Sequence, residues 1–120
     1  MAKTLVVKTT AGADAPERCA QAFSVAATAA ASGVPVSLWL TGEAAWLAVP
    51  GRAETFVLAE SPPLAHLLAA VLAEGSVTLC AQCAARRAIG PDDTLPGIRI
   101  AGAATFVAEV MTDGAQALVY

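Results

Sequence analysis

The segment from Ser76 to Ile89, S-V-T-L-C-A-Q-C-A-A-R-R-A-I, changes from strand-forming to helix-forming residues within a short distance. The residues up to Leu79 favour a β-strand, whereas the alanine-rich run from Ala81 to Ala88 favours a helix. Cys80 therefore lies at the junction, as the last residue of the strand or the cap of the helix. A strand that leads directly into a helix is typical of α/β proteins.

The remainder of the chain repeats this alternation on both sides of the segment. We expect strands at residues 3–8, 35–40, 76–80, 98–101 and 117–120. We expect helices at residues 14–32, 41–50, 61–74, 81–88 and 103–111. Residues 52–60 carry no clear pattern, because T-F-V-L within them fits either a short strand or a stretch packed against a neighbour.

Strands and helices that alternate with short turns predict a three-layer α/β/α sandwich around a mostly parallel, five-stranded sheet. We expect one domain over residues 1–120, with the flavodoxin-like strand order 2-1-3-4-5. In that order the first and third strands are neighbours at the topological switch point. The loop that contains Thr10, Gly12 and Asp14 would then face the Cys80 turn across one cleft, which is the expected site.

The first helix has a recognisable start and an apolar side. Asp14 and Glu17 resemble a capping box, and Pro16 falls in the first turn. Cys19 and Phe23 lie on the side opposite the polar residues, so we expect Cys19 to be a small buried hydrophobic residue.

The composition excludes several classes of protein. A net charge of −3 with scattered basic residues leaves no basic stripe for nucleic acid. Hydrophobic residues make up 57% of the chain, but Gly, Pro, Ser or charged residues interrupt them well short of a membrane span, and no signal peptide is expected. The odd number of cysteines, three, argues for a reducing compartment. We therefore expect a cytoplasmic protein that binds neither nucleic acid nor membrane.

The cysteine pair is the leading candidate for chemistry. Cys80 faces the unpaired N–H groups at the start of the helix, which favour a thiolate. At 100° per residue, the alanines of this helix form one apolar stripe, and Cys83 falls on the opposite face with Arg86 and Arg87. We expect both sulfurs and both guanidinium groups to share the exposed side, where the arginines raise the positive potential or contact a partner.

A thiolate in this position can attack a sulfane sulfur and carry it as a persulfide. Cys83 can then resolve the persulfide or close a disulfide, because C-x-x-C places the two sulfurs within reach. Two other interpretations stay open. The pair can be two ordinary reduced cysteines near a surface, or it can reduce peroxide.

Metal and cofactor sites are less well supported. A structural zinc site needs four N or S ligands, and only His66 is available as a third ligand for the cysteine pair. His66 itself is expected to be a solvent-exposed or interface residue. Thr10 and Gly12 resemble the phosphate loop of a flavin-binding protein only weakly, and Asp14 adds a negative charge there. We therefore expect no metal and no cofactor.

A second class of function is a non-catalytic, homo-oligomeric binding module. In that case Trp39, Trp46 and the segment 52–60 would form the interface or the ligand pocket. Two tryptophans and an alanine-rich surface favour an oligomer over a monomer.

Four stretches of the chain resemble the DsrE/DsrF-like family. They are K-T-L-V-V-K-T-T-A-G-A-D-A-P-E-R at residues 3–18, G-V-P-V-S-L-W-L-T-G-E-A at 33–44, L-A-E-G-S-V-T-L-C-A-Q-C-A-A-R-R-A-I at 72–89, and the ending from G-I-R-I-A-G-A-A-T-F-V at 97–107 to D-G-A-Q-A-L-V-Y. The resemblance covers nearly the whole chain and rests on the order and spacing of these stretches.

The resemblance implies a flavodoxin-like fold without a flavin, assembled as a homotrimer or hexamer. It also implies a persulfide on a cysteine that follows the third strand, received from a small TusA-like carrier protein. Cys80 matches that cysteine, and Cys83 matches a second cysteine that many relatives contain.

Overall fold

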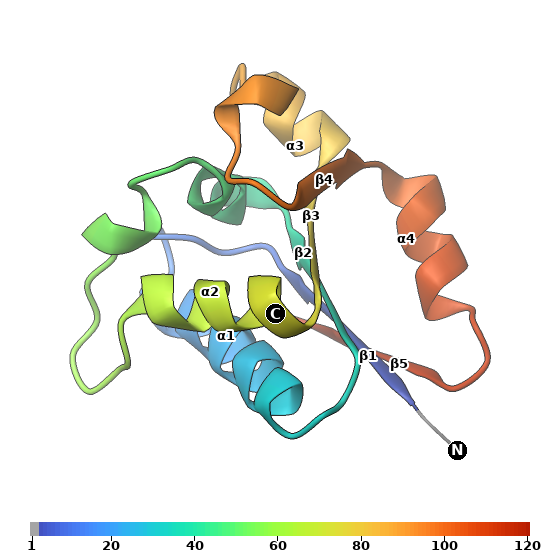
Figure 1. The fold of residues 1–120 in the computed structure, drawn as a ribbon. Helices are drawn as coiled ribbons and strands as arrows, with labels where there is room; N and C mark the ends of the chain where they lie inside the picture. Colours follow the sequence, from blue (N-terminus) through green and yellow to red (C-terminus); the bar gives the residue numbers. More distant parts are fainter. Residues whose placement is uncertain (1–2) are drawn as a thin grey trace.

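A computed structural model describes residues 3–120, which form a parallel sheet of five strands with helices on both faces (Figure 1). The strands are β1 (Thr4–Thr9), β2 (Val36–Leu40), β3 (Ser76–Cys80), β4 (Ile98–Ala101) and β5 (Ala115–Val119). The α-helices are α1 (Pro16–Ala31), α2 (Leu64–Glu74), α3 (Ala81–Arg86) and α4 (Ala103–Val110). Short 3-10 helices are η1 (Gly42–Ala48), η2 (Ala53–Thr55) and η3 (Pro91–Asp93). Among these described helices, none has both the length and the apolar character needed to cross a membrane.

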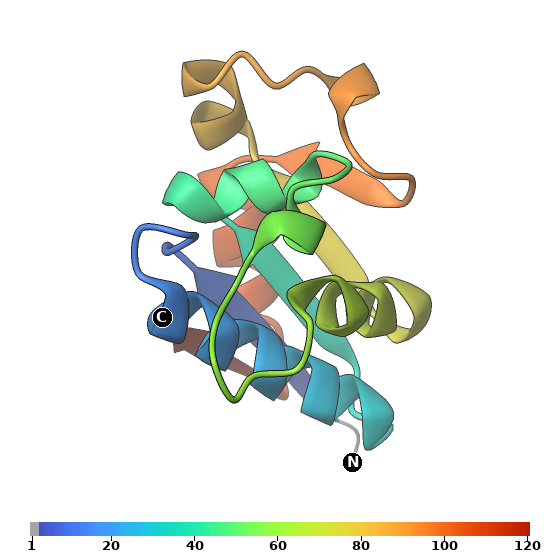
Figure 2. The same cartoon turned by 90° about the vertical axis from the view of Figure 1, so that its left-hand side faces the viewer.

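The helices are distributed unequally over the sheet. α1 and α2 pack together on one face, and α4 lies on the other. Figure 2 shows the same layers with α1 and α2 in front of the sheet and α4 behind it. The short helix α3 and η1 lie at the carboxyl ends of the strands, where α/β proteins place their sites. The predicted three-layer α/β/α class is confirmed.

The strand order differs from the prediction. It is β4-β3-β2-β1-β5, so β1 pairs with β2 and β5, and β2 separates β1 from β3. The predicted order 2-1-3-4-5 is therefore wrong. The observed strand order depends on the face of the sheet on which each connecting helix lies. Crossovers between parallel strands are right-handed, so α1 and α2 on one face carry the chain stepwise in one direction. The crossover through α4 uses the other face, and it returns the chain to the free edge of β1.

The core lies between the sheet and the two helices α1 and α2. Cys19, Phe23 and Ala26 on the inner side of α1 have 0% exposed surface, which confirms the predicted burial of Cys19. This burial and, to a smaller extent, the charge of Asp14 raise the pKa of the Cys19 thiol to about 12. Cys19 therefore stays a neutral thiol inside the core.

One local prediction does not match the structure, and one of two open alternatives is excluded by it. α1 is capped by Ala15 without a side-chain hydrogen bond, so the predicted capping box of Asp14 and Glu17 is wrong. The carboxylate of Asp14 instead accepts the N–H of Gly12 at 2.8 Å, because the loop after β1 turns back on itself before the helix starts. T-F-V-L in residues 52–60 does not form a strand; η2 is followed by an irregular segment.

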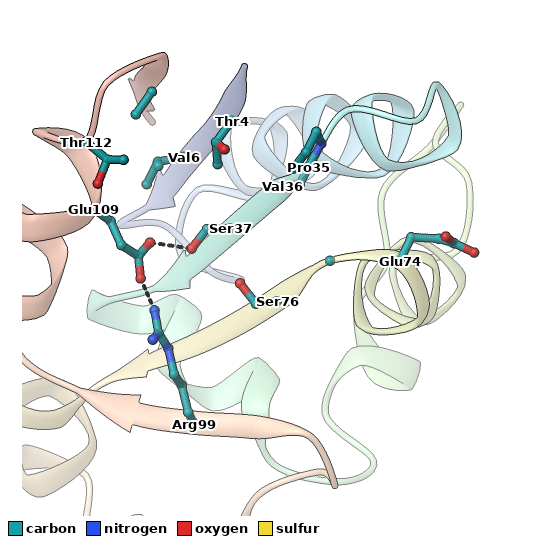
Figure 3. Close-up of a pocket in the computed structure, with 12 residues that line it drawn as sticks. Thr4, Val6, Pro35, Val36, Ser37, Glu74, Ser76, Arg99, Glu109 and Thr112 are labelled. Carbon is teal, nitrogen blue, oxygen red and sulfur yellow. Dashed lines mark hydrogen bonds and ion pairs between the residues drawn. The ribbon is translucent and has the colours of Figure 1, made fainter. Parts of the chain in front are cut away.

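One carboxylate links α4 to the sheet. Glu109 of α4 accepts hydrogen bonds from the Ser37 hydroxyl at 2.6 Å and from the Trp39 indole N–H at 3.1 Å, and it forms an ion pair with Arg99. Arg99 in turn donates to the Thr78 hydroxyl at 2.6 Å. Figure 3 shows Glu109 reaching from its helix toward Ser37 and Arg99, beside an open pocket of about 490 Å³. The pocket thus combines the polar side chains of this network with apolar residues of the sheet such as Val6 and Val36.

Replacing this carboxylate should weaken the fold. Glu109→Ala leaves the Trp39 indole, which is 2% exposed as a residue, and the Ser37 hydroxyl without their acceptor. We expect a loss of about 1–3 kcal/mol in the free energy of unfolding, measured by urea denaturation. Glu54→Ala, at an exposed glutamate of η2, is the matched control and should change stability little. Equal stability of the two variants would contradict the linking role of Glu109.

Candidate functional site

A pocket of about 340 Å³ lies at the carboxyl ends of β1, β2 and β3, under the first turn of α4. Strands β1, β2 and β3, helices α3 and α4, and the first residue of η1 contribute to it. Its lining residues are Lys8 and Thr10; Trp39, Thr41 and Gly42; Cys80, Gln82 and Cys83; and Ala103 and Phe106. Both cysteines of the C-x-x-C motif therefore line one cavity.

The loop after β1 contributes to the pocket only through Thr10. The predicted cleft between neighbouring first and third strands is wrong, because the end of β2 lies between them and forms the floor of the pocket. Gly12 and Asp14 are not among the lining residues. Gly12 is instead pressed against η1, where a Cβ atom would lie 2.6 Å from the carbonyl oxygen of Glu43.

Cys80 is the last residue of β3 and the N-cap of α3, as the sequence predicted. Partial burial is the largest influence on its pKa and raises it. The N–H groups of Cys83 and Gln82, the Cys83 thiol and the charge of Lys8 act against this, and together they hold the pKa of the Cys80 thiol below its ordinary value. The site therefore favours the thiolate of a half-buried sulfur.

Cys83 lies on the inner side of α3. It is 8% exposed, and its sulfur accepts the backbone N–H of Gly42 at 3.2 Å. The prediction that Cys83 shares the exposed face with the arginines is wrong. α3 has only six residues and packs against η1, so it buries Cys83 and Ala84, whereas Ala85 is exposed.

The two arginines point away from the pocket. Arg87 forms an ion pair with Glu43 at 2.8 Å and donates to the carbonyl oxygen of Cys83 at 3.1 Å, so it fastens α3 to η1. Arg86 is exposed on α3. Neither residue lines the cavity, and a contribution of either to Cys80 stays a prediction.

A lysine and two aromatic rings complete the site, and neither Lys8 nor Phe106 was predicted from the sequence to belong to it. The ammonium group of Lys8 lies 5.0 Å from the centre of the Phe106 ring. Trp39 packs edge-to-face on Phe106 with ring centres 5.3 Å apart. The available signal was a lysine in the strand directly after Val6 and Val7, which are both buried. Trp39 was predicted to matter only for a binding module.

Other predicted residues lie apart from this pocket. Trp46 belongs to η1, where the Arg52 guanidinium stacks 4.4 Å above its ring. His66 is exposed on α2. In the described residues 3–120, no three His, Cys, Asp or Glu side chains come together in a group that could hold a metal ion.

The reactivity of Cys80 should follow its electrostatic environment. We expect its alkylation by iodoacetamide to rise with pH around a midpoint below the ~8.5 of a free cysteine. The rate at each pH is measured at Cys80 by peptide mass spectrometry. Cys19 in the same folded protein is the internal control and should stay unmodified, because it is buried and its pKa is about 12. A midpoint at or above that of free cysteine would contradict the thiolate site.

The fold has known relatives. The crystal structure of the ychN protein from E. coli matches with a TM-score of 0.80 and 18% sequence identity, covering 100% of both chains. A protein of unknown function from Methanobacterium thermoautotrophicum matches with a TM-score of 0.73 and 10% identity, again over 100% of both chains. At these identities the likeness establishes the fold. No curated protein sequence matches the chain.

A family model decides the relationship. The model of the DsrE/DsrF-like family matches residues 2–120, which is nearly the whole chain and includes every residue that lines the pocket. The resemblance inferred from the four sequence stretches is thereby confirmed, and the protein belongs to the DsrE/DsrF-like family.

Proposed function

We propose that the protein is a sulfur-transfer protein that carries a persulfide on Cys80. The observation that supports this most strongly is the environment of the Cys80 sulfur, where N–H donors, a second thiol and a lysine favour the thiolate within a pocket. The Cys80 thiolate attacks the outer sulfur of a donor persulfide, R–S–SH. A new S–S bond forms on Cys80, the donor S–S bond breaks, and the donor leaves as the thiolate R–S⁻. Membership of a family with sulfur-relay members supports the same chemistry.

Cys83 has a second role in this proposal. Its side chain helps to lower the pKa of the Cys80 thiol and so favours a charged sulfur there. After loss of its proton, Cys83 can also attack the inner sulfur of the Cys80 persulfide. That step forms a Cys80–Cys83 disulfide and releases HS⁻, with no external oxidant. Cys83 is thus an auxiliary or resolving thiol.

We propose that the protein works as a homo-oligomer in the cytoplasm and exchanges sulfur with a small TusA-like carrier protein. Three free cysteines fit a reducing compartment. Exposed apolar side chains lie on two neighbouring elements at the α4 side of the sheet. Val107 and Met111, which are 55% and 76% exposed, lie on and just after α4. Val119, which is 64% exposed, lies on β5 beside Lys8 and so faces the same side. Because β5 is also an edge strand, this surface favours contact with another copy of the chain.

A non-catalytic, homo-oligomeric binding module is the second candidate. The same apolar surface favours it, as does a pocket with two aromatic side chains, Trp39 and Phe106. In this case the pocket would hold a ligand without forming a bond to Cys80.

Sulfur loading separates the two candidates. The reduced protein is exposed to polysulfide and its intact mass is measured. We expect one or more added sulfur atoms on the wild type and on Cys19→Ser, the control for a cysteine outside the pocket. We expect none on Cys80→Ser. Loading that survives Cys80→Ser, or a wild type that takes up no sulfur, would overturn the proposed carrier and leave the binding module.

The assembly is tested by charge placed on the apolar surface. We expect the wild type to be larger than a monomer in size-exclusion chromatography with light scattering. The double variant Met111→Glu/Val119→Glu should move it toward the 12.0 kDa monomer, because a buried unpaired carboxylate opposes association. Val57→Glu, at a valine that is 85% exposed in the loop after η2, is the matched control. A wild type that is monomeric would contradict the proposed oligomer.

A further inference from the structure

We propose that Lys8 forms an anion subsite in the Cys80 pocket, so that the sulfur donor bound there is a small anion. The inference follows first from the position of Lys8 in β1. Val7 packs in the core under α1, and Lys8, the next residue along the strand, faces α4 on the opposite side of the sheet. Its ammonium group lies over the Phe106 ring, at the wall of the cavity.

The charge of Lys8 is not neutralised by a carboxylate. Within residues 3–120, the ion pairs join Arg87 to Glu43 and Arg99 to Glu109, and neither involves Lys8. The contact of Lys8 with Phe106 leaves its positive charge in place, since an aromatic ring attracts a cation without removing its charge. The lysine therefore remains able to bind an anion.

The rest of the pocket carries no opposing charge. None of its lining residues is acidic; besides Lys8 and the two cysteines, they are apolar, hydroxyl or amide residues and one glycine. A cation in a cavity with low-dielectric walls raises the local concentration of anions. The influence of Lys8 on the Cys80 thiol indicates that the ammonium group lies within electrostatic range of the reacting sulfur.

The size of the cavity limits the class of ligand. About 340 Å³ lies near the lower end of the range for small-molecule sites, and Trp39, Phe106 and Ala103 make one wall apolar. The site thus fits a compact anion, such as thiosulfate or a short persulfide. The sulfur chemistry in this inference rests on the proposed function, but the anion subsite itself does not.

Thiosulfate illustrates how Lys8 would act. The Cys80 thiolate attacks the outer sulfur, the bond from that sulfur to the sulfonate sulfur breaks, and its electron pair leaves with sulfite. The persulfide on Cys80 keeps one negative charge and sulfite takes two, which equals the charge of the reactants. Lys8 counteracts the repulsion between thiolate and donor as they approach.

Two alkylating reagents of different charge test the subsite without any sulfur transfer. Iodoacetate is an anion and iodoacetamide is neutral, and both attack the same Cys80 thiolate. The ratio of their rates at Cys80, measured by tandem mass spectrometry of the peptide, is therefore independent of the thiol pKa. We expect Lys8→Met to lower the iodoacetate-to-iodoacetamide ratio by about three- to tenfold, the effect of one charge a few ångströms away in a partly solvated site.

Matched variants make the result specific. Lys8→Arg keeps the charge and should keep the ratio. Arg18→Met removes an exposed positive charge from α1, outside the pocket, and should leave the ratio unchanged. Circular dichroism checks that each variant is folded, and Lys8→Gln replaces Lys8→Met if the latter is not. An unchanged ratio in a folded, uncharged Lys8 variant, or an equal fall in Arg18→Met, would overturn the subsite.

The same variants separate this inference from the proposed function. If wild type shows the anion preference but takes up no sulfur from thiosulfate or polysulfide, the subsite stands and the persulfide carrier fails. If wild type loads sulfur on Cys80 but Lys8→Met does not change the reagent ratio, the carrier stands and the subsite fails.

Discussion

The close contact at Gly42 is the constraint on which the site depends. Gly42 follows β2 with φ of +55°, and a Cβ atom there would lie 2.5 Å from the carbonyl oxygen of Thr10. Its N–H donates to the sulfur of Cys83 on α3. Gly42, which follows β2, thus contacts both the loop after β1 and the helix after β3. A side chain at this position would separate Thr10 from α3 and open the pocket between them.

On the side of α4, the wall of the pocket is formed by aromatic side chains that a carboxylate of α4 holds in place. Trp39 donates its indole N–H to Glu109 and presents its ring edge-to-face to Phe106, while Phe106 lies under the ammonium group of Lys8. The carboxylate that links α4 to the sheet therefore also orients the aromatic residues beside Cys80. Trp39 links the two pockets, because it hydrogen-bonds to Glu109 in the first and lines the second together with Cys80. A change in the position of α4 would therefore alter the surroundings of the Cys80 thiol.

The fold class and the position of Cys80 were predictable because both follow from local patterns. Strand-forming residues before Cys80 and alanines after it define a β3–α3 junction whatever the rest of the chain does. The burial of Cys19 follows in the same way from the apolar side of one long helix. Strand order was not predictable on these grounds, because it depends on which face of the sheet each helix crosses. The capping box at Asp14 failed because a loop hydrogen bond to Gly12 competed with the helix cap.

The sequence by itself determined an α/β chain with a cysteine at a strand-to-helix junction, since propensity and periodicity act over neighbouring residues. Only the tertiary structure decided which way Cys83 faces and which cation accompanies Cys80. Helical periodicity alone placed Cys83 with the arginines, but packing of the short α3 against η1 turned it inward and engaged Arg87 with Glu43. Lys8 reaches the site from a strand two positions away from β3 in the sheet. The sequence around Lys8 shows an unusual lysine beside two buried valines, but it does not indicate that this lysine lies near Cys80.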